Sequence, residues 1–278
     1  MVEKHNEDLS AYTTVRIGGT AERMLIPEST EELLEVIRRY DPKYYLGGGS
    51  NLLINDRRFE MVVNLRHFDD SIRNIGHGQY RVGASAHLQN LIRQINQDGY
   101  GGIEYLYNVP GLVGGAIAMN AGTGSKTNKA ISDFIVSVDL IRDGQLITLP
   151  RENCGFSYRH SDFKGRNNIV IVSAVFEFPV MDLEDTTRAK KEKMEYYRNN
   201  QDPSFPNFGS VYQTYNHRIM QVVKKLKLGK RVHFSGKTLN WILNEGGTYA
   251  DAIKTIKKVE SIHKIFGKKI VREVVTWD

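Results

Sequence analysis

The stretch that most restricts the fold of this chain is Val109-Pro110-Gly111-Leu112-Val113-Gly114-Gly115-Ala116-Ile117-Ala118-Met119-Asn120-Ala121-Gly122. It is built almost wholly from small residues, which let a backbone approach a large flat or phosphorylated ligand closely. The alternative is a glycine-rich helix packed closely against a sheet. On its own, the stretch leaves both interpretations open.

A second glycine loop, Leu46-Gly47-Gly48-Gly49-Ser50-Asn51-Leu52-Leu53, directly follows an apolar strand candidate. Successive glycines allow backbone N–H groups to turn toward an anion, and Ser50 and Asn51 can add side-chain hydrogen bonds. Alone, a glycine triplet is more typical of a tight turn. The spacing does not match G-x-G-x-x-G, so a Rossmann dinucleotide domain is not predicted. Two such loops in one domain favour a bound nucleotide cofactor.

The elements predicted around these loops mix helices with strands. A capping signal at 29–32 begins a helix, a second helix is predicted over 86–98, an Asp-Gly hairpin over 137–149 and a strand over 168–178. Beyond 181 the pattern predicts a charged helix to 200, helices near 216–228 and 249–265, and a final strand over 269–276. We therefore predict an α+β fold with a first domain over 1–180, in subdomains of about 1–65 and 66–180, and a smaller domain over 181–278.

The charge of the chain is unevenly distributed. Its 278 residues contain 38 Lys and Arg against 32 Asp and Glu, a formal net charge of +6. Residues 217–278 hold 14 basic and 5 acidic side chains, or +9, whereas residues 1–216 carry −3. A basic segment can meet nucleic acid, an anionic membrane surface or a phosphate-bearing small molecule, and solvated lysines are the alternative. No nucleic-acid recognition motif is present, so we expect no nucleic-acid partner.

The remaining composition excludes several classes of protein. With 40% hydrophobic and 25% charged residues, the chain is neither disordered nor a collagen nor a small disulfide scaffold. Cys154 is the sole cysteine, which is typical of a reducing compartment. The first eight residues lack a signal-peptide pattern, and no apolar run could cross a bilayer. We therefore expect a cytoplasmic protein, and the eight scattered histidines predict no metal site.

Several motifs, in order along the chain, resemble those of the UDP-N-acetylenolpyruvoylglucosamine reductase family, the UDP-N-acetylmuramate dehydrogenases. Thr13–Ala21 resembles the family's N-terminal signature, the two glycine loops its FAD-binding segments, and Phe156–Lys164 its Tyr-Arg-x-Ser motif. The resemblance implies the FAD-binding fold of vanillyl-alcohol-oxidase-type enzymes. Some of those oxidases attach flavin covalently through a His beside the first loop, where this chain has Ser50 and Asn51, so non-covalent FAD is expected. The cofactor-binding residues implied are Gly47, Gly48, Gly49, Ser50, Asn51, Leu52, Pro110, Gly111, Gly114, Gly115, Ala116, Asn120, Ala121 and Gly122.

The chemistry implied by the resemblance has two half-reactions. NADPH reduces FAD, and the reduced flavin gives hydride to the enolpyruvyl group of UDP-N-acetylglucosamine enolpyruvate, yielding UDP-N-acetylmuramate for peptidoglycan. Arg159 would hold the substrate carboxylate, Glu273 would polarise it, and Ser210 would protonate the carbanion. Strand alternation predicts that Glu273 shares an apolar face with Val271 and Val275. The alternatives are a surface arginine, a turn serine and a solvated glutamate on a frayed strand.

The substrate pocket matches the family less well than the FAD domain does. The resemblance implies substrate contacts from Tyr158, Arg198, Lys237 and Asn244. The family usually has Lys-Asn-Pro where this chain has Gln213-Thr214-Tyr215, and its His is Thr238 here. The inserted substrate-capping region of the longer subtype is missing, so the chain resembles the shorter subtype. We expect a monomer that binds a UDP-sugar and NADPH.

Three other functions are consistent with parts of the sequence. A paralogue that reduces another enolpyruvyl nucleotide sugar would explain the departures in the pocket. A flavin oxidase would reoxidise rapidly with oxygen and no enolpyruvyl acceptor. A nucleic-acid binder would explain the basic C-terminal segment but would retain no yellow chromophore on purification.

Overall fold

The chain folds into two compact units. A computed structural model describes residues 1–124, 129–226 and 228–278, and its mixed helices and strands confirm the predicted α+β class. Unit 1 comprises Met1–Lys4, Met24–Gly48 and Met61–Tyr197, and unit 2 comprises His5–Arg23, Gly49–Glu60 and Arg198–Asp278. Unit 2 therefore includes two segments from the N-terminal part of the chain. The assignment of 1–180 to FAD and of 181–278 to substrate stays a prediction.

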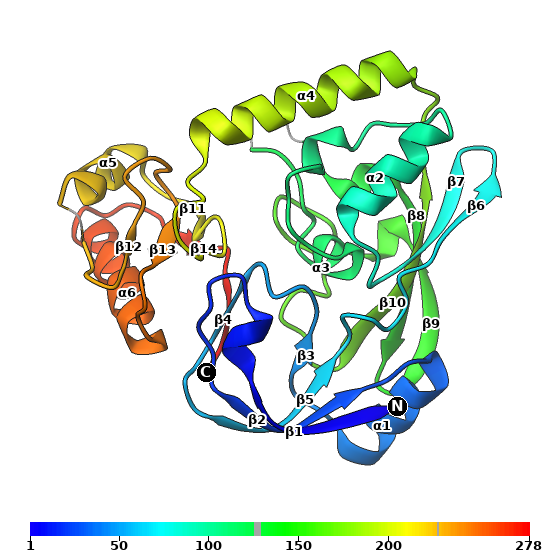
Figure 1. The fold of residues 1–278 in the computed structure, drawn as a ribbon, viewed down its shortest axis with the longest axis horizontal. Coiled ribbons are helices and arrows are strands. Elements are labelled where there is room, and N and C mark those ends of the chain that lie inside the picture. Colours follow the sequence, from blue (N-terminus) through cyan, green and yellow to red (C-terminus); the bar gives the residue numbers. More distant parts are fainter. Residues whose placement is uncertain (125–128, 227) are drawn as a thin grey trace. The chain divides into compact units, whose positions relative to one another are not determined.

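An antiparallel five-stranded sheet lies at the centre of unit 1, in the order β6-β7-β10-β8-β9 (Figure 1). Its strands are β6 (Ile72–Gly76), β7 (Gln79–Gly83), β8 (Ile135–Arg142), β9 (Gln145–Pro150) and β10 (Ile169–Glu177). The predicted hairpin forms β8 and β9. Asp143 and Gly144 both have positive φ, 50° and 73°, as the two-residue turn of such a hairpin requires.

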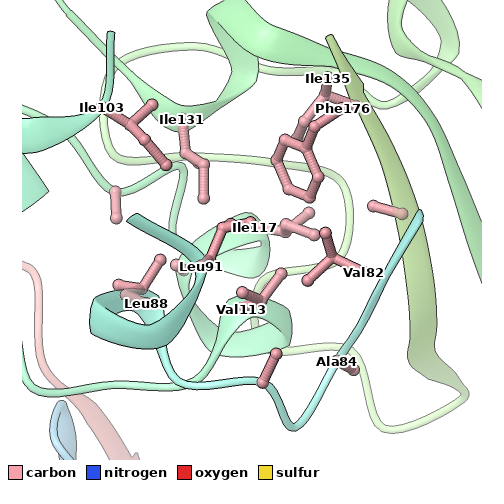
Figure 2. Close-up of a cluster of buried hydrophobic side chains, with 14 of the residues drawn as sticks. Val82, Ala84, Leu88, Leu91, Ile103, Val113, Ile117, Ile131, Ile135 and Phe176 are labelled. Atoms are coloured by element: carbon pink, nitrogen blue, oxygen red, sulfur yellow. The ribbon is translucent and has the colours of Figure 1, made fainter. Parts of the chain in front are cut away.

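Helices α2 (Leu88–Gln97) and α3 (Val113–Ala118) contribute apolar side chains to the core on this sheet, as Figure 2 shows. The cluster includes Val82, Leu88, Leu91, Ile103, Val113, Ile117, Ile131, Ile135 and Phe176. A Cβ added at Gly114 would lie only 2.9 Å from the Ala84 Cβ, so this glycine permits close packing of α3. A Cβ at Gly115 would meet nothing within 4 Å. Close packing is thus confirmed at Gly114, whereas contact of the stretch with a ligand stays a prediction.

The second sheet has the order β1-β2-β5-β3, with β1 (Val2–Asp8), β2 (Thr20–Ile26), β3 (Tyr45–Leu46) and β5 (Arg58–Asn64). Helix α1 (Thr30–Tyr40) begins at Ser29, whose Oγ accepts a hydrogen bond from the Glu32 N–H at 3.2 Å. The helix ends at Asp41, which has a left-handed φ of 43°. The predicted capping signal is thus confirmed. In unit 1, Leu33 and Val36 of α1 pack in a buried cluster with residues of β2, β5, β8 and β10.

The described residues of unit 2 form three strand pairs and two α-helices, besides parts of β1, β2 and β5 and a short 3-10 helix. The pairs are β4 (Leu52–Ile54) with β15 (Val275–Trp277), β11 (Tyr212–Thr214) with β14 (Val271–Arg272), and β12 (Val232–Phe234) with β13 (Ile242–Asn244). The helices are α5 (His217–Leu226) and α6 (Tyr249–Ile265). Both were predicted, although Lys227, within the range predicted for α5, lies outside the described residues. The core of unit 2 joins Val15, Ile17 and Leu53 to apolar side chains of both helices.

The predicted single strand over 269–276 is wrong, because the chain changes partner at Glu273. β14 pairs antiparallel with β11, whereas β15 pairs parallel with β4. Between them the N–H groups of Glu273 and Val274 both donate to the Val211 carbonyl, at 2.8 and 3.4 Å. The strict alternation of side chains between the two faces of a strand is lost there. Val274 is buried, whereas Glu273 is half-buried. The predicted apolar face of Val271, Glu273 and Val275 does not form.

The charged segment after 181 forms α4 (Leu183–Asn200), as predicted. Short 3-10 helices lie at Leu9–Tyr12, Glu104–Leu106, Ile131–Phe134 and Arg151–Asn153. Across the described ranges, none of the helices has the length and apolar character needed to span a bilayer. The same ranges contain no grouping of three His, Cys, Asp or Glu side chains suited to a metal ion.

Candidate functional site

The carbonyl groups of the first glycine loop are held on one side by Arg66. In unit 1 its Nε donates to the Gly47 carbonyl at 3.2 Å and its Nη2 to the Gly48 carbonyl at 3.1 Å. A trans peptide directs each carbonyl opposite to the next N–H. The N–H groups of Gly48 and Gly49 therefore point away from Arg66, the arrangement that makes a backbone anion site. Sequence reasoning missed Arg66, because nothing in the local pattern marks it.

Unit 2 anchors the continuation of this loop. The Thr14 N–H, from the N-terminal signature, donates to the Gly49 carbonyl at 3.1 Å. Gly49 has a φ of 67°, and a Cβ there would lie 2.0 Å from the Tyr12 carbonyl oxygen. Both conformation and space therefore require glycine at this position. Ser50 and Asn51 follow, and Leu52 begins β4.

The two glycine loops meet within unit 1. A Cβ at Gly48 would lie 3.5 Å from the Gly111 Cα, and the Gly111 carbonyl accepts from the Leu88 N–H at 3.2 Å. A Cβ at Gly47, like one at Gly115, would meet nothing within 4 Å. The backbone at Gly47 and Gly115, which no side chain covers, thus borders open space, and the N–H groups of Gly48 and Gly49 lie beside it. This cradle suits a large ligand that carries phosphate.

The last predicted cofactor residues have mixed surroundings. Ala116 and Ala121 are buried, and Pro110 is exposed. A Cβ at Gly122 would lie 2.2 Å from the Lys129 carbonyl oxygen, so this glycine allows two backbone segments to approach. Asn120 is buried and structural, since its Nδ2 donates to the Ser157 carbonyl at 2.8 Å. The structure therefore brings this end of the loop to the Tyr-Arg-x-Ser motif.

That motif forms a tight turn in unit 1. The backbone groups of Ser157 and His160 exchange two hydrogen bonds of 3.1 Å, which places Tyr158 and Arg159 at the tip. Ser161 Oγ anchors the turn by donating to the Ala118 carbonyl at 2.7 Å. Arg159 has a φ of 55°, a region that non-glycine residues seldom occupy. Such strained residues concentrate at functional sites.

A polar pocket of about 180 Å³ adjoins the turn. It is lined by Asn120, Gly122, Thr123, Lys129, Ala130, Ser132, Asp133, Arg151, Phe156, Ser157, Tyr158 and Arg159. Three of these side chains are cationic and one is anionic, so the pocket favours a small anion. Lys193 of α4 adds to this field. Burial, together with repulsion from Arg159, lowers the pKa of Lys193, a residue that the sequence did not single out.

Unit 2 brings Ser210 and Glu273 together. The Glu273 N–H donates to the carbonyl of Val211, the residue after Ser210, at 2.8 Å. Asn51 joins them, because its Nδ2 donates to the Glu273 carbonyl at 3.3 Å and its own carbonyl accepts from the Val275 N–H at 3.1 Å. Three residues predicted from distant parts of the sequence thus lie in one region. Arg159 belongs to unit 1.

The predicted substrate residues of unit 2 are engaged with backbone. Lys237 Nζ donates to the Arg198 carbonyl at 2.6 Å. Asn244 is buried, with its Nδ2 donating to the Val15 carbonyl at 2.8 Å and its Oδ1 accepting from the Gly247 N–H at 2.7 Å. These contacts give both side chains a structural role. Their contact with substrate stays a prediction.

Two relatives and one solved structure match nearly the whole chain, and one family model matches part of it. The family described as "FAD binding domain" matches residues 21–149. The UDP-N-acetylenolpyruvoylglucosamine reductase 1 of Bacillus cereus is 31% identical, over 90% of this chain and 86% of the relative. That of Carboxydothermus hydrogenoformans is 34% identical, over 97% and 92%. The crystal structure of UDP-N-acetylenolpyruvylglucosamine reductase (MurB) from Thermus caldophilus shares the fold, with a TM-score of 0.81 at 24% identity, over 100% of this chain and 98% of that one.

Proposed function

Because this chain belongs to the UDP-N-acetylenolpyruvoylglucosamine reductase family, we propose that it reduces UDP-N-acetylglucosamine enolpyruvate to UDP-N-acetylmuramate. NADPH is the hydride donor and FAD the non-covalent cofactor. The observation that carries this proposal is the 34% identity that extends over 97% of the chain, across both units.

The residues of the cradle fit FAD. The N–H groups of Gly48 and Gly49 suit its diphosphate, and the bare backbone at Gly47 and Gly115 leaves space for its bulk. When bound, FAD would supply the transfer of hydride from NADPH to the enolpyruvyl carbon. The chain itself would bind and orient the reactants and move the proton.

Three residues carry the catalytic roles. Arg159 binds the substrate carboxylate. The cationic pocket beside it and the neighbouring Lys193 support this role. Ser210 donates the proton, with Glu273 positioned beside it to polarise the carboxylate. The hydrogen bond from Glu273 to Val211 supports this pairing. Tyr158, Arg198, Lys237 and Asn244 complete the substrate-binding set.

The domain roles and the setting belong to the same proposal. Residues 1–180 serve FAD and residues 181–278 serve the UDP-sugar. The protein works as a monomer in the cytoplasm. The lone buried Cys154 supports the compartment, because a chain that can form no internal disulfide is typical of a reducing environment.

Two glycine variants test the cofactor cradle. Gly47→Ala is expected to leave the unfolding temperature of the FAD-free protein unchanged, because its Cβ meets nothing, while it weakens FAD affinity. Gly49→Ala is expected to destabilise the FAD-free protein by roughly 1–3 kcal/mol or more, because the strained φ adds to the contact with Tyr12. Thermal unfolding and fluorescence titration with FAD measure the two effects. A loss of stability in Gly47→Ala equal to that in Gly49→Ala would contradict the assignment of open space.

The proposed activity is tested by anaerobic titration of the NADPH-reduced enzyme with UDP-N-acetylglucosamine enolpyruvate. Recovery of the oxidised flavin spectrum, with one equivalent of UDP-N-acetylmuramate formed, is expected. No reoxidation by this compound, together with reoxidation by another enolpyruvyl nucleotide sugar, would assign the chain to a paralogue. Rapid reoxidation by oxygen alone would identify an oxidase.

A further inference from the structure

One face of α6 is rich in exposed lysines. Lys254, Lys257, Lys258, Lys264 and Ile265 are all exposed, and their spacing of three, four and seven residues places them on one side of the helix. We call this set the α6 face. The structure describes α6 in full; of its two acidic residues, Asp251 lies three positions before Lys254, and Glu260 lies three positions after Lys257 and four before Lys264.

Both acidic residues of α6 have partners on the flanks of the helix. Asp251 Oδ2 accepts from the Thr248 N–H at 3.1 Å and so caps the N-terminus. Glu260 forms an ion pair with Arg272, whose Nη2 donates to it at 2.8 Å. The opposite side of α6 is buried in the core of unit 2. Both carboxylates of α6 are thus bonded to groups outside the α6 face, and the four lysines of that face outnumber them.

Exposed apolar side chains continue this face into the turn that follows. Ile265 is 79% and Phe266 65% exposed, and Gly267, Lys268 and Lys269 after them are exposed as well. Adjacent exposed apolar residues of this size are costly in water and commonly mark a surface that meets another phase or partner. Here they lie directly beside two further lysines.

An apolar groove of about 760 Å³ runs along the same helix. It is lined by Leu228, Ala250, Ile253, Lys254, Lys257, Lys258, Ser261 and Ile262. The lysines border an apolar floor, so their aliphatic stems can cover apolar groups while their ammonium groups reach anions. The sequence from His217 to Asn244, which includes Leu228, contains no Asp or Glu.

This combination fits a lipid surface better than nucleic acid. Nucleic-acid surfaces commonly use arginine forks, and neither the α6 face nor the turn contains an arginine; Phe266 is their one aromatic ring, and it adjoins the aliphatic Ile265. Lysine point charges beside protruding apolar side chains are typical of elements that lie in the headgroup region of a bilayer. We propose that the α6 face and the turn Ile265–Lys269 bind the surface of a bilayer containing anionic phospholipids.

Vesicle sedimentation tests this binding. The FAD-bound full chain is expected to sediment with phosphatidylcholine vesicles that contain phosphatidylglycerol, and not with pure phosphatidylcholine. High salt should release it, because screening shortens the range of the attraction. Lys254→Glu with Lys258→Glu is expected to weaken binding at least about thirtyfold, and Phe266→Ser about tenfold.

The matched control is Lys43→Glu with Lys191→Glu, which makes the same charge change at exposed positions of unit 1. It should bind vesicles like the unchanged protein, and all variants should retain flavin absorbance. Equal binding to pure phosphatidylcholine, or an equal loss in the control, would overturn the proposal. So would binding to an acidic peptide or to DNA with no affinity for the vesicles.

Discussion

Replacing Ser210 with alanine is expected to stop reduction of the enolpyruvyl substrate while NADPH still reduces the flavin at its normal rate. A positioned proton donor contributes roughly a hundredfold to ten-thousandfold to a rate, and alanine has no proton to give. The flavin half-reaction involves no proton transfer to the substrate carbon. Anaerobic stopped-flow absorbance of the flavin measures the two half-reactions separately.

Ser261→Ala provides the control for this experiment. It removes a hydroxyl from the same unit, where Ser261 Oγ donates to the Lys257 carbonyl at 2.9 Å, and it should leave both half-reactions unchanged. Slow flavin reduction combined with normal substrate reduction in Ser210→Ala would be inconsistent with a proton donor. Glu273→Gln should also impair only the substrate half-reaction, because Glu273 is assigned to the same step.

Arg159→Met is expected to lower kcat/KM for the enolpyruvyl substrate by roughly a hundredfold to a thousandfold. The variant lacks the group that binds the carboxylate as negative charge develops on it. Arg159→Lys should restore only part of the loss, because an ammonium cannot form the paired hydrogen bonds of a guanidinium. Steady-state kinetics with the enolpyruvyl substrate, at saturating NADPH, measure the effect.

Arg166→Met is the matched control, since Arg166 is exposed in the same unit and lies outside the pocket. It is expected to react like the unchanged enzyme. If Arg159→Met kept its kcat/KM while the FAD affinity fell, Arg159 would belong to the cofactor and not to the substrate.

The sequence predicted those elements whose signals are local. The capping residue Ser29 and the Asp143-Gly144 turn each act within a few residues of their own position, so pattern and structure agree there. The glycine loops were also recognisable, because only glycine fits a position such as Gly49.

The rest depends on partners that are distant in the sequence. The strand breaks at Glu273 because its N–H donates to the Val211 carbonyl and its carbonyl accepts from Asn51 Nδ2. The alternation of residues along the strand cannot predict these two distant partners. Arg66 was missed for the same reason, since its role lies in its bonds to Gly47 and Gly48. Asn244 resembles a substrate contact, and the structural role of its amide, which ties the Val15 segment to β13 within unit 2, could not be predicted either.

The pairing of β15 with β4 has a consequence for the order of synthesis. The register joins Val275 to Leu52 and Trp277 to Ile54, so unit 2 is closed by residues that the ribosome adds long after their partners in β4. The strands of the five-stranded sheet, by contrast, are all made before residue 178. Contacts between such distant segments must wait for the whole intervening chain. The core of unit 2 therefore cannot be completed before β15 has been synthesised, whereas the five-stranded sheet of unit 1 can form earlier.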